Sequence, residues 1–387
     1  MSINLVNEYK RMVLGGTDMV SLSTQDILEA IEKKVNSNMH SLNAKASHMT
    51  KDGVYDNNSY DWWTSGFWPG ILWLMYEITG KDKYKNSAWN FDEKIETLYL
   101  RENRFHHDVG FQFLPTAVIK YKITGNKDAR RRGIFAADFL AGRFNIAGNF
   151  IRAWNQDEKI GWSIIDTCMN LSLLFWASTE SGDPRFKHIG VAHADTVIRE
   201  FIRDDGSVKH IVCFNPETGE VVDEKGGQGY GPGSSWSRGQ AWALYGMANT
   251  YKSTGDVKYL KAAIKVAKYF ISCMPEDNVA YWDFRTPSNI DEPRDTSAAA
   301  CAASGLLEIA DCLGQEDGQI YKKWAEKILL SLAKSYSNFS KPDEEGILNS
   351  ATSNKPGNIG INVSLIYGDY FFVEGIAKLL GWKRRIF

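Results

Sequence analysis

The stretch GWSIIDTCMNLSLLFWASTESGDPRFKHIGVAHADTVIREF, residues 161–201, contains two helical patterns of different character. The first, Trp162 to Ser181, is apolar or small on nearly every face, which is typical of a helix that is buried on all sides. The second, Pro184 to Phe201, carries charged residues at helical spacing, as a helix with one solvated face does. Gly182 separates them, and glycine is favoured just after a helix end. The stretch therefore predicts a helical hairpin.

The same hairpin recurs along the chain. Six helical patterns stop at a glycine, namely Gly80, Gly125, Gly182, Gly255, Gly314 and Gly381. Amphipathic outer helices are predicted at residues 24–38, 83–102, 127–142, 184–201, 257–273 and 318–337. Because inner and outer helices alternate, we predict a single all-α domain over residues 1–387, an (α/α)6 toroid with long loops at one mouth. An open superhelix of helix pairs is the alternative.

Composition and charge narrow the possible partners. The 387 residues are 43% apolar and 24% charged, as in an ordinary soluble protein, and the net charge of −2 argues against a nucleic-acid partner. Met1 to Met19 mixes charged with apolar residues, and we see no later membrane span, so we expect a cytoplasmic protein without membrane contact. The five cysteines are scattered and predict neither a disulfide framework nor a zinc site.

The predicted ring brings several carboxylates to one mouth. Since every inner helix ends at its glycine, all their N-terminal ends lie at the opposite side of the ring. Asp166 stands there within an apolar pattern, where an isolated charge is costly unless it is paired or neutralised. Its alternative role is to cap a core helix. The other carboxylates predicted at this mouth are Asp61, Asp108, Asp295 and Asp369.

Tryptophans accompany these acids. The predicted mouth holds Trp62, Trp154, Trp162, Trp236 and Trp242. Indole rings stack on the apolar faces of sugars, and carboxylates bind sugar hydroxyls, so the combination favours a carbohydrate site with acid–base chemistry. The alternative is that these rings only fill the interior of a large barrel.

Several motifs resemble one known family over nearly the whole chain. They are Asp61-Trp62 with Thr64-Ser65-Gly66-Phe67-Trp68-Pro69-Gly70, His107-Asp108-Val109-Gly110-Phe111, Ile165-Asp166-Thr167 with Asn170-Leu171, Ser237-Arg238-Gly239-Gln240-Ala241-Trp242 and Tyr367-Gly368-Asp369-Tyr370. In these motifs the chain resembles the unsaturated glucuronyl hydrolases of glycoside hydrolase family 88. The resemblance implies an (α/α)6 barrel and catalytic roles for Asp108 and Asp166. Substrate contacts are implied for Trp62, His107, Trp154, His210, Gln228, Trp236, Arg238 and Trp242.

The chemistry that the resemblance implies is hydration. The substrate would be a lyase-generated disaccharide with a C4=C5 double bond in its terminal uronic acid. Asp166 would protonate C4 and activate the water that attacks C5, and no metal or organic cofactor is expected. His106-His107-Asp108 is not predicted to bind a metal, because side chains of adjacent residues are expected to point apart.

One further motif concerns the choice of substrate. Ser350, Ser353 and Lys355 form a Ser-x-x-Ser-x-Lys pattern that resembles the sulfate-binding motif of members acting on sulfated glycosaminoglycans. Gly226 and Gly227 stand beside Gln228, where another cation would be expected in a sulfate-preferring member. A plain surface loop would have the same composition.

Other functions remain open at the level of sequence. An unsaturated rhamnogalacturonyl hydrolase acting on pectin fragments, a sugar epimerase, an inverting glycosidase and a non-catalytic glycan-binding protein can all use the predicted barrel. The sequence also leaves open whether the protein is a monomer or a dimer.

Overall fold

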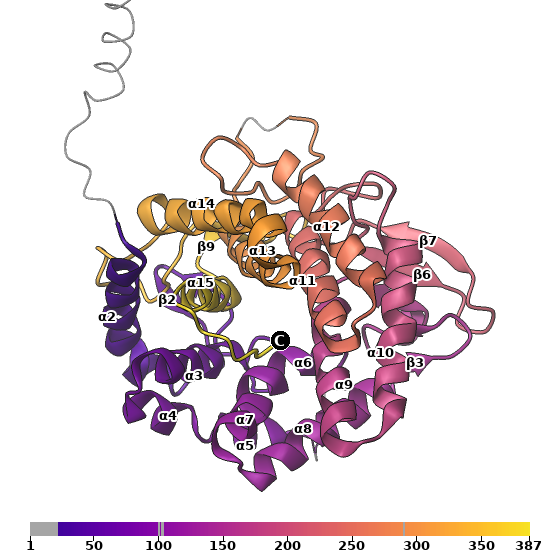
Figure 1. The fold of residues 1–387 in the computed structure, drawn as a ribbon, viewed down its shortest axis with the longest axis horizontal. Coiled ribbons are helices and arrows are strands. Elements are labelled where there is room, and N and C mark those ends of the chain that lie inside the picture. Colours follow the sequence, from indigo (N-terminus) through magenta and orange to yellow (C-terminus); the bar gives the residue numbers. More distant parts are fainter. Residues whose placement is uncertain (1–21, 100, 102–103, 289–290) are drawn as a thin grey trace, which may run out of the picture.

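The computed structural model describes residues 22–99, 101, 104–288 and 291–387. Helices form a closed ring around a central axis (Figure 1). The inner helices pack on one another in chain order, and the last of them packs on the first. The fold therefore confirms the predicted (α/α)6 toroid, and it excludes the open superhelix.

Each inner helix is apolar on most faces because it is surrounded by protein. The inner elements of the described chain are α3 (Phe67–Thr79), α6 (Val109–Phe113) continued by η1 (Leu114–Val118) and α7 (Ile119–Thr124), α9 (Thr167–Ser181), α11 (Ser237–Thr254), α13 (Thr296–Asp317) and α15 (Ile366–Leu379). In α11, every residue from Ser237 to Thr250 is buried. Such a helix has no solvated face to show an amphipathic pattern.

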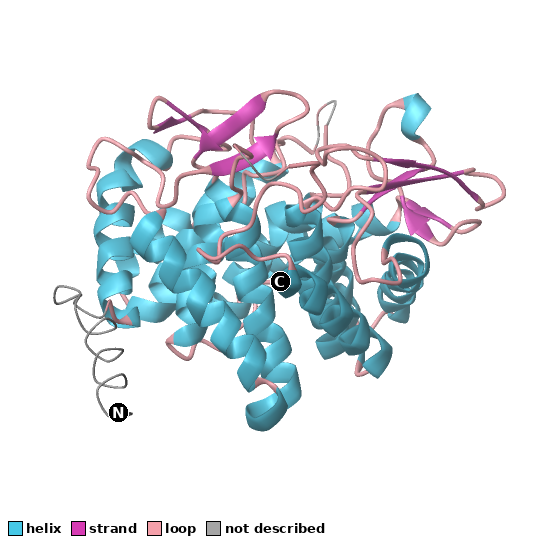
Figure 2. Cartoon of the chain, turned by 90° about the horizontal axis from the view of Figure 1, so that it is seen from above, coloured by secondary structure: helices cyan, strands magenta, loops and turns pink. Residues whose placement is uncertain are grey.

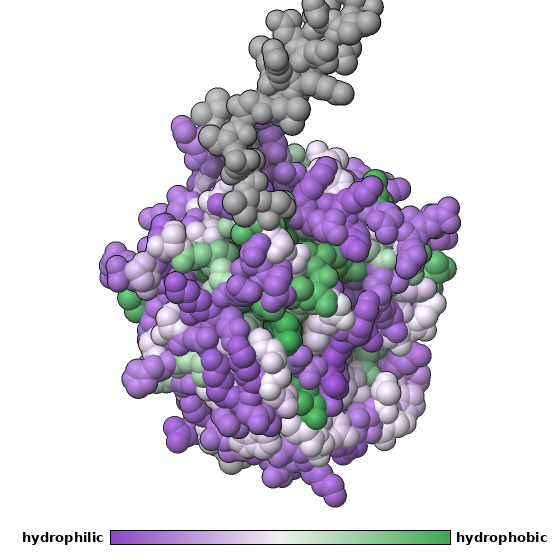
Figure 3. Space-filling view, turned by 60° about the vertical axis from the view of Figure 1, so that its left-hand side comes forward, coloured by the Kyte–Doolittle hydropathy of each residue, from purple (hydrophilic) through white to green (hydrophobic). Residues whose placement is uncertain are grey.

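The outer layer consists of amphipathic helices. Its described elements are α2 (Thr24–Leu42), α4 (Asp82–Ala88) with α5 (Phe91–Glu96), α8 (Lys127–Ala141), α10 (Pro184–Thr196) with η3 (Val197–Phe201), α12 (Val257–Ser272) and α14 (Gln319–Ser335). Two short helices thus replace the single helix predicted at residues 83–102. Hydrophilic side chains cover much of the face shown in Figure 3, with apolar patches between them.

Five of the six predicted helix stops are confirmed, and the sixth, Gly314, is a kink within its helix. The glycines concerned have φ angles between 68° and 92°, a left-handed conformation that glycine adopts without strain. Five of them follow the last turn of an inner helix. Gly314 instead marks a kink, because one further helical turn continues α13 to Asp317.

Short strands gather at one end of the ring, above the helices in Figure 2. The pairs are β1 (Thr50–Lys51) with β2 (Val54–Tyr55), β3 (Phe144–Asn145) with β4 (Phe150–Ile151), and β8 (Ala351–Asn354) with β9 (Ile359–Val363). A three-stranded antiparallel sheet contains β5 (Trp162–Ile164), β6 (Ile211–Phe214) and β7 (Val221–Lys225). The segment 144–161 also holds the short helix η2 (Asp157–Lys159). These strands lie within the long connecting segments that were predicted at one mouth of the ring.

The start of the inner helix α9 was also predicted wrongly. The helix expected from Trp162 begins at Thr167, because Trp162–Ile164 pairs with β6 as a strand. Asp166 therefore lies in the turn between β5 and α9, and not within a helix. Apolar residues rich in isoleucine fit either a buried helix or a buried strand, so the periodicity alone could not separate the two.

Two predictions about membranes concern different parts of the chain. The expected lack of a signal peptide concerns residues 1–19, which lie outside the described residues. Among the described helices, α13 is long and apolar enough by composition to cross a bilayer, contrary to the expectation from sequence. Most of α13 is buried within the ring, as in the core helix of a soluble protein.

Candidate active site

A cavity of about 670 Å³ opens at the mouth where the inner helices begin. Ten of the residues predicted for the site line it: Trp62, His107, Asp108, Trp154, Asp166, Gln228, Trp236, Arg238, Trp242 and Ser353. These residues come from distant parts of the chain, so the closed ring is what brings them together. Aromatic and polar side chains thus share one concave site, which is the usual form of a small-molecule pocket.

His107 lies between two carboxyl groups at the floor of this pocket. Its Nε2 atom is 2.8 Å from Asp166 Oδ1 and 3.2 Å from Asp108 Oδ1. Its Nδ1 atom is 2.7 Å from the Ala153 carbonyl oxygen, to which it donates a hydrogen bond. The three side chains therefore form one connected cluster, which we call the Asp–His–Asp cluster.

Two helix starts position the carboxyl groups. Asp108 and Asp166 precede α6 and α9, and in the described structure neither side chain accepts a capping hydrogen bond from its own helix. The capping role considered for Asp166 is therefore not seen. Asn170 joins the two helices, since its Oδ1 accepts from Phe111 N at 3.0 Å and its Nδ2 lies 3.4 Å from Asp108 Oδ1.

The close approach of α6 and α9 depends on Gly110. A Cβ atom added at this position would lie 2.5 Å from Asn170 Oδ1 and 2.8 Å from its Cα, which is too close for any side chain. The glycine therefore allows the two aspartates to reach the same histidine.

The electrostatics of the cluster favour bound protons near neutral pH. Burial raises the pKa of Asp108 to about 7, although nearby His107 acts in the opposite direction. Burial alone would lower the pKa of His107, but the negative charges of Asp108 and Asp166 outweigh it and raise that pKa to about 8. Such closely spaced groups titrate as a unit.

Arg238 provides a second buried charge at the pocket wall. It is 1% exposed and pairs with Asp295, and its guanidinium group also donates to the Thr352 and Ser353 carbonyl oxygens at 2.8 and 2.6 Å. Its Cζ atom lies 4.5 Å from the ring centre of Trp236. The orientation of the arginine is therefore fixed before any ligand binds.

His210 lies behind the pocket and not among its lining residues in the described chain. Its ring stacks on Trp236 with centroids 4.2 Å apart, and its Nδ1 is 3.0 Å from Gln228 N. Gln228 Nε2 in turn donates to the Ser353 carbonyl oxygen at 2.8 Å. His210 thus supports two residues that face the cavity.

The indole rings differ in exposure. Trp62 is 41% exposed at the rim, whereas Trp236 and Trp242 are 4% and 1% exposed. Trp154 lies edge-on to His107, with ring centroids 6.0 Å apart. Trp162 packs against Trp154 outside the described lining of the pocket. The pocket therefore offers one accessible ring at its rim and deeper aromatic walls below it.

The three residues of the Ser-x-x-Ser-x-Lys pattern are not gathered at the cavity. Ser353 lines it, but Ser350 and Lys355 lie outside its described lining. Ser350 Oγ donates to Asn349 Oδ1 at 2.8 Å, and Lys355 forms an ion pair with Glu292. The lysine is thus already neutralised by a carboxylate.

The other candidate carboxylates each have fixed partners. Asp61 lines the pocket and pairs with Arg104, with both oxygens 3.0 Å from guanidinium nitrogens. Asp295 pairs with Arg238. Asp369 accepts from Ile347 N and Leu348 N at 2.8 Å and from Tyr55 OH at 2.7 Å. Asp108 and Asp166 are distinguished from them by sharing a titratable partner.

Histidines 106 and 107 lie closer together than we predicted. Their rings are stacked with centroids 5.0 Å apart, and potential ligand atoms of His106, His107 and Asp108 lie within 4.8 Å of one another. A turn before α6, in which Val109 N donates to the His106 carbonyl oxygen, directs these side chains to the same side. The expectation that the adjacent side chains point apart is therefore wrong.

Some lining residues had no signal in the sequence analysis. His48 and Arg104 come from irregular segments without a recognisable motif. Asn170, which does not line the cavity but contacts Asp108, belonged to a quoted motif without an assigned role. Gly227 explains the cation that is missing beside Gln228. It has a φ of 57°, and a Cβ atom there would lie 2.5 Å from His210 Nδ1, so a lysine or arginine does not fit.

Carboxyl groups and indole rings that share one pocket of a helical ring are typical of glycoside hydrolases. The model of Glycosyl Hydrolase Family 88 matches residues 30–335. The unsaturated chondroitin disaccharide hydrolase of Streptococcus pneumoniae (strain ATCC BAA-255 / R6) is 36% identical over 335 residues, covering 85% of this chain and 84% of the relative.

Solved structures agree with this match. The crystal structure of the unsaturated glucuronyl hydrolase of Bacillus sp. GL1 superposes with a TM-score of 0.89 at 33% identity, covering 92% of this chain and 97% of that one. A mutant of the Streptococcus agalactiae enzyme in complex with dGlcA-GalNAc6S has a TM-score of 0.79 at 30% identity, covering 94% and 93%. The chain belongs to glycoside hydrolase family 88 and is a glycosidase.

Proposed function

We propose that this enzyme removes the 4,5-unsaturated uronic acid from the non-reducing end of lyase-generated glycosaminoglycan disaccharides. The observation that carries the proposal is the Asp–His–Asp cluster at the floor of an aromatic pocket. The relatives named above act on, or were solved with, substrates of this kind.

The proposed reaction is hydration of the C4=C5 double bond. This bond belongs to an enol ether, so C4 accepts a proton from Asp166 and positive charge develops at C5. Water then forms a bond to C5 and gives its proton to Asp166. The resulting hemiketal opens to a C5 ketone, and C1 releases the second sugar. Because the anomeric carbon is not attacked, the spacing of the two carboxyl groups does not predict retention or inversion.

The cluster provides the proton that this step requires. With the pKa of Asp108 raised to about 7 by burial and that of His107 raised to about 8 by the two nearby carboxylates, the cluster holds protons at neutral pH. The uronate carboxylate of a bound substrate adds negative charge, which favours retention of a proton by the cluster. Asp166 reaches this store through His107 Nε2, and Asp108 Oδ1 lies 3.2 Å from the same nitrogen, where it would orient and polarise the histidine.

The wall residues suit an anionic sugar. Trp62 and Trp154 would stack on the sugar rings, and Trp236 and Trp242 would close the deeper end. Gln228 and Arg238 would lie near the uronate carboxylate, with His210 holding Trp236 and Gln228 in place. In this arrangement the arginine contributes positive charge without a large change in its own position.

Sulfated disaccharides are included in the proposal. Ser353 lines the pocket, and Lys355 is two residues further along the chain. Because Lys355 is paired with Glu292, sulfate binding requires the lysine to exchange one anion for another. We therefore expect sulfated substrates to be accepted with a modest preference.

The location of the enzyme in the cytoplasm stays a prediction.

The test is the loss of ultraviolet absorbance from the conjugated C4=C5 carboxylate. Unsaturated chondroitin disaccharides, with and without sulfate, are compared with an unsaturated rhamnogalacturonan disaccharide. We expect both chondroitin sugars to be consumed and the pectin-derived sugar to react much more slowly. Faster consumption of the pectin-derived sugar would assign the enzyme to rhamnogalacturonan, and binding without consumption of any sugar would indicate a glycan-binding protein.

A further inference from the structure

We propose that His106, His107 and Asp108 form a binding site for a zinc ion, and that zinc bound there excludes substrate from the pocket. The inhibitory part rests on the proposed function, whereas the metal site itself does not. The three residues offer two imidazole nitrogens and a carboxylate oxygen, which are the donors that Zn²⁺ prefers besides thiolates.

The separations of the donor atoms suit this ion. His106 Nδ1 lies 3.3 Å from Asp108 Oδ2, and His107 Nε2 lies 3.2 Å from Asp108 Oδ1. In a tetrahedral site with metal–ligand bonds of about 2.0–2.2 Å, neighbouring ligand atoms lie roughly 3.3–3.5 Å apart. Each ring nitrogen therefore lies at ligand–ligand separation from a different oxygen of Asp108, and the three candidate ligand atoms lie within 4.8 Å of one another, so side-chain rotation would close them around one ion.

His106 supports the site independently. Its Nδ1 atom is buried and makes no hydrogen bond among the described residues, and its ion-pair contact with Asp108 Oδ2 is 3.3 Å long. A contact beyond the usual hydrogen-bond distance satisfies a buried polar atom only in part. Coordination of a metal ion by this nitrogen would satisfy it.

His107 makes a hydrogen bond through its other ring nitrogen, as metal-binding histidines usually do. Its Nδ1 atom donates to the Ala153 carbonyl oxygen, which fixes the ring and leaves Nε2 directed at the carboxylates. Asp166 Oδ1, 2.8 Å from the same Nε2, is close enough to act as a fourth ligand.

Occupation of the site would stop the proposed reaction for three reasons. The ion would take the Nε2 atom that links His107 to Asp166, and it would neutralise the carboxyl groups that handle protons. It would also fill part of the cavity that these residues line. Zinc and substrate should therefore compete, and substrate should protect the enzyme from zinc.

The direct test is calorimetric titration of the metal-free full-length protein with zinc chloride alone. We expect one ion per chain, and affinity lower by at least about tenfold in His106→Asn. His188→Asn, which alters an exposed histidine on α10, is the matched control and should bind zinc as the wild type does. Cobalt(II) absorption spectra provide a second readout, because a tetrahedral site gives intense visible bands that zinc should abolish.

Two results would overturn the site: absence of stoichiometric zinc binding by the wild type, or equal affinity in His106→Asn. Circular dichroism shows whether the variant folds, and His106→Gln serves as a second substitution if it does not. Activity assays then test inhibition separately. Turnover that persists with the site fully occupied by zinc would overturn the exclusion of substrate, whereas a wild type that consumes no unsaturated uronide would refute the proposed function and leave the titration result valid.

Discussion

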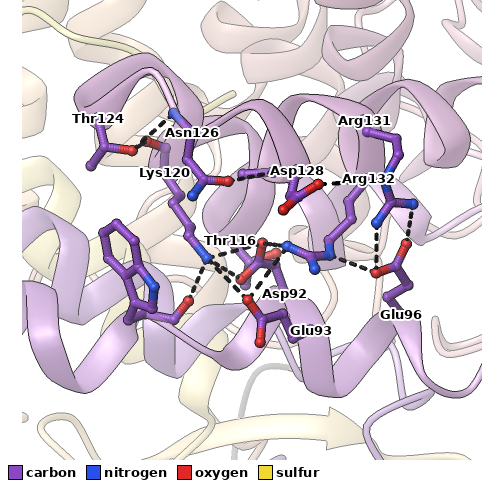
Figure 4. Close-up of polar contacts among 12 residues, drawn as sticks. Asp92, Glu93, Glu96, Thr116, Lys120, Thr124, Asn126, Asp128, Arg131 and Arg132 are labelled. Atoms are coloured by element: carbon purple, nitrogen blue, oxygen red, sulfur yellow. Dashed lines mark hydrogen bonds and ion pairs between the residues drawn. The ribbon is translucent and has the colours of Figure 1, made fainter.

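Two buried acidic clusters of this protein differ in what neutralises them. In the outer layer, Asp92 is 1% exposed and pairs with Lys120 Nζ at 3.0 Å and Arg132 Nη1 at 2.9 Å, within a network that also includes Glu96 and Arg131 (Figure 4). At the mouth, Asp108 and Asp166 share His107. Lysine and arginine keep their charge at neutral pH, whereas histidine can lose it.

This difference separates a structural role from a chemical one. A carboxylate between a lysine and an arginine is held by two ion pairs, so it can hold α5 against its neighbours. Carboxyl groups around a histidine can exchange protons near neutral pH. We therefore expect changes at Asp92 to affect the stability of the fold, and changes at Asp166 to affect turnover.

Replacement of the proposed acid should give the largest effect. Asp166→Asn removes a group that can donate and accept the proton, and we expect turnover to fall by about 10³–10⁴-fold, toward the upper end of general acid–base contributions. Asp204→Asn, at a fully exposed position, is the matched control. Turnover is followed by ultraviolet absorbance with a chondroitin disaccharide, and near-wild-type activity of Asp166→Asn would remove Asp166 from the mechanism.

Loss of the structural carboxylate should destabilise the protein instead. Asp92→Asn leaves Lys120 and Arg132 without their central partner, and breaking such buried pairs typically costs about 3–5 kcal/mol. We expect a lower denaturant midpoint, with kcat per folded molecule unchanged. A wild-type denaturant midpoint with a reduced kcat in Asp92→Asn would show that Asp92 serves turnover and not the stability of the fold.

The pH dependence of stability should also distinguish the clusters. Burial raises the pKa of Asp108 to about 7 from an ordinary value of 3.8, so its protonated form is favoured in the folded state, and stability is lost as the pH rises from about 4 to 7. Nearby carboxylates raise the pKa of His107 to about 8 from 6.5, so its contribution is lost in the same direction, between about pH 6.5 and 8.

Asp108→Asn should remove part of this dependence. We expect the melting temperature of this variant, measured relative to that of the wild type, to be about 2–4 °C higher at pH 8 than at pH 5, a shift that corresponds to roughly 2–3 kcal/mol for a chain of 387 residues. Differential scanning calorimetry at the two pH values measures it. A constant difference would show that Asp108 does not bind its proton more tightly in the folded protein.

The smallest effects are expected at the ion pair of Lys355 with Glu292. This pair is partly exposed, unlike the two buried clusters. Lys355→Ala should lower the preference for sulfated over unsulfated disaccharide by less than about tenfold, because the pair is partly exposed. Glu292→Gln should raise this preference, since it frees the ammonium group. If both variants change the preference in the same direction, Lys355 does not hold the sulfate.

The fold could be predicted from sequence because its signals are local. Five glycines mark helix ends and a sixth marks the kink of α13, and the change from buried to amphipathic helices shows which layer each helix belongs to. The start of α9 was missed because the pairing of Trp162–Ile164 with β6 is a contact between distant segments. Propensity alone cannot reveal such a contact.

The site was predicted less completely for a similar reason. Motifs identified Asp108 and Asp166, but the position of His107 between them depends on the approach of α6 to α9 at Gly110. The stacking of His106 on His107 and the pairing of Lys355 with Glu292 likewise depend on tertiary structure. Sequence spacing gives the residue types, whereas the ring determines which of them meet.

We propose that the Asp–His–Asp cluster catalyses hydration of the double bond and not direct attack at the anomeric carbon. A single time course that records both the C4=C5 absorbance and the appearance of the released sugar distinguishes the two reactions. We predict that absorbance is lost at least as fast as the sugar is released, and that both signals disappear in Asp166→Asn. Release of the sugar while the conjugated chromophore persists would contradict the account.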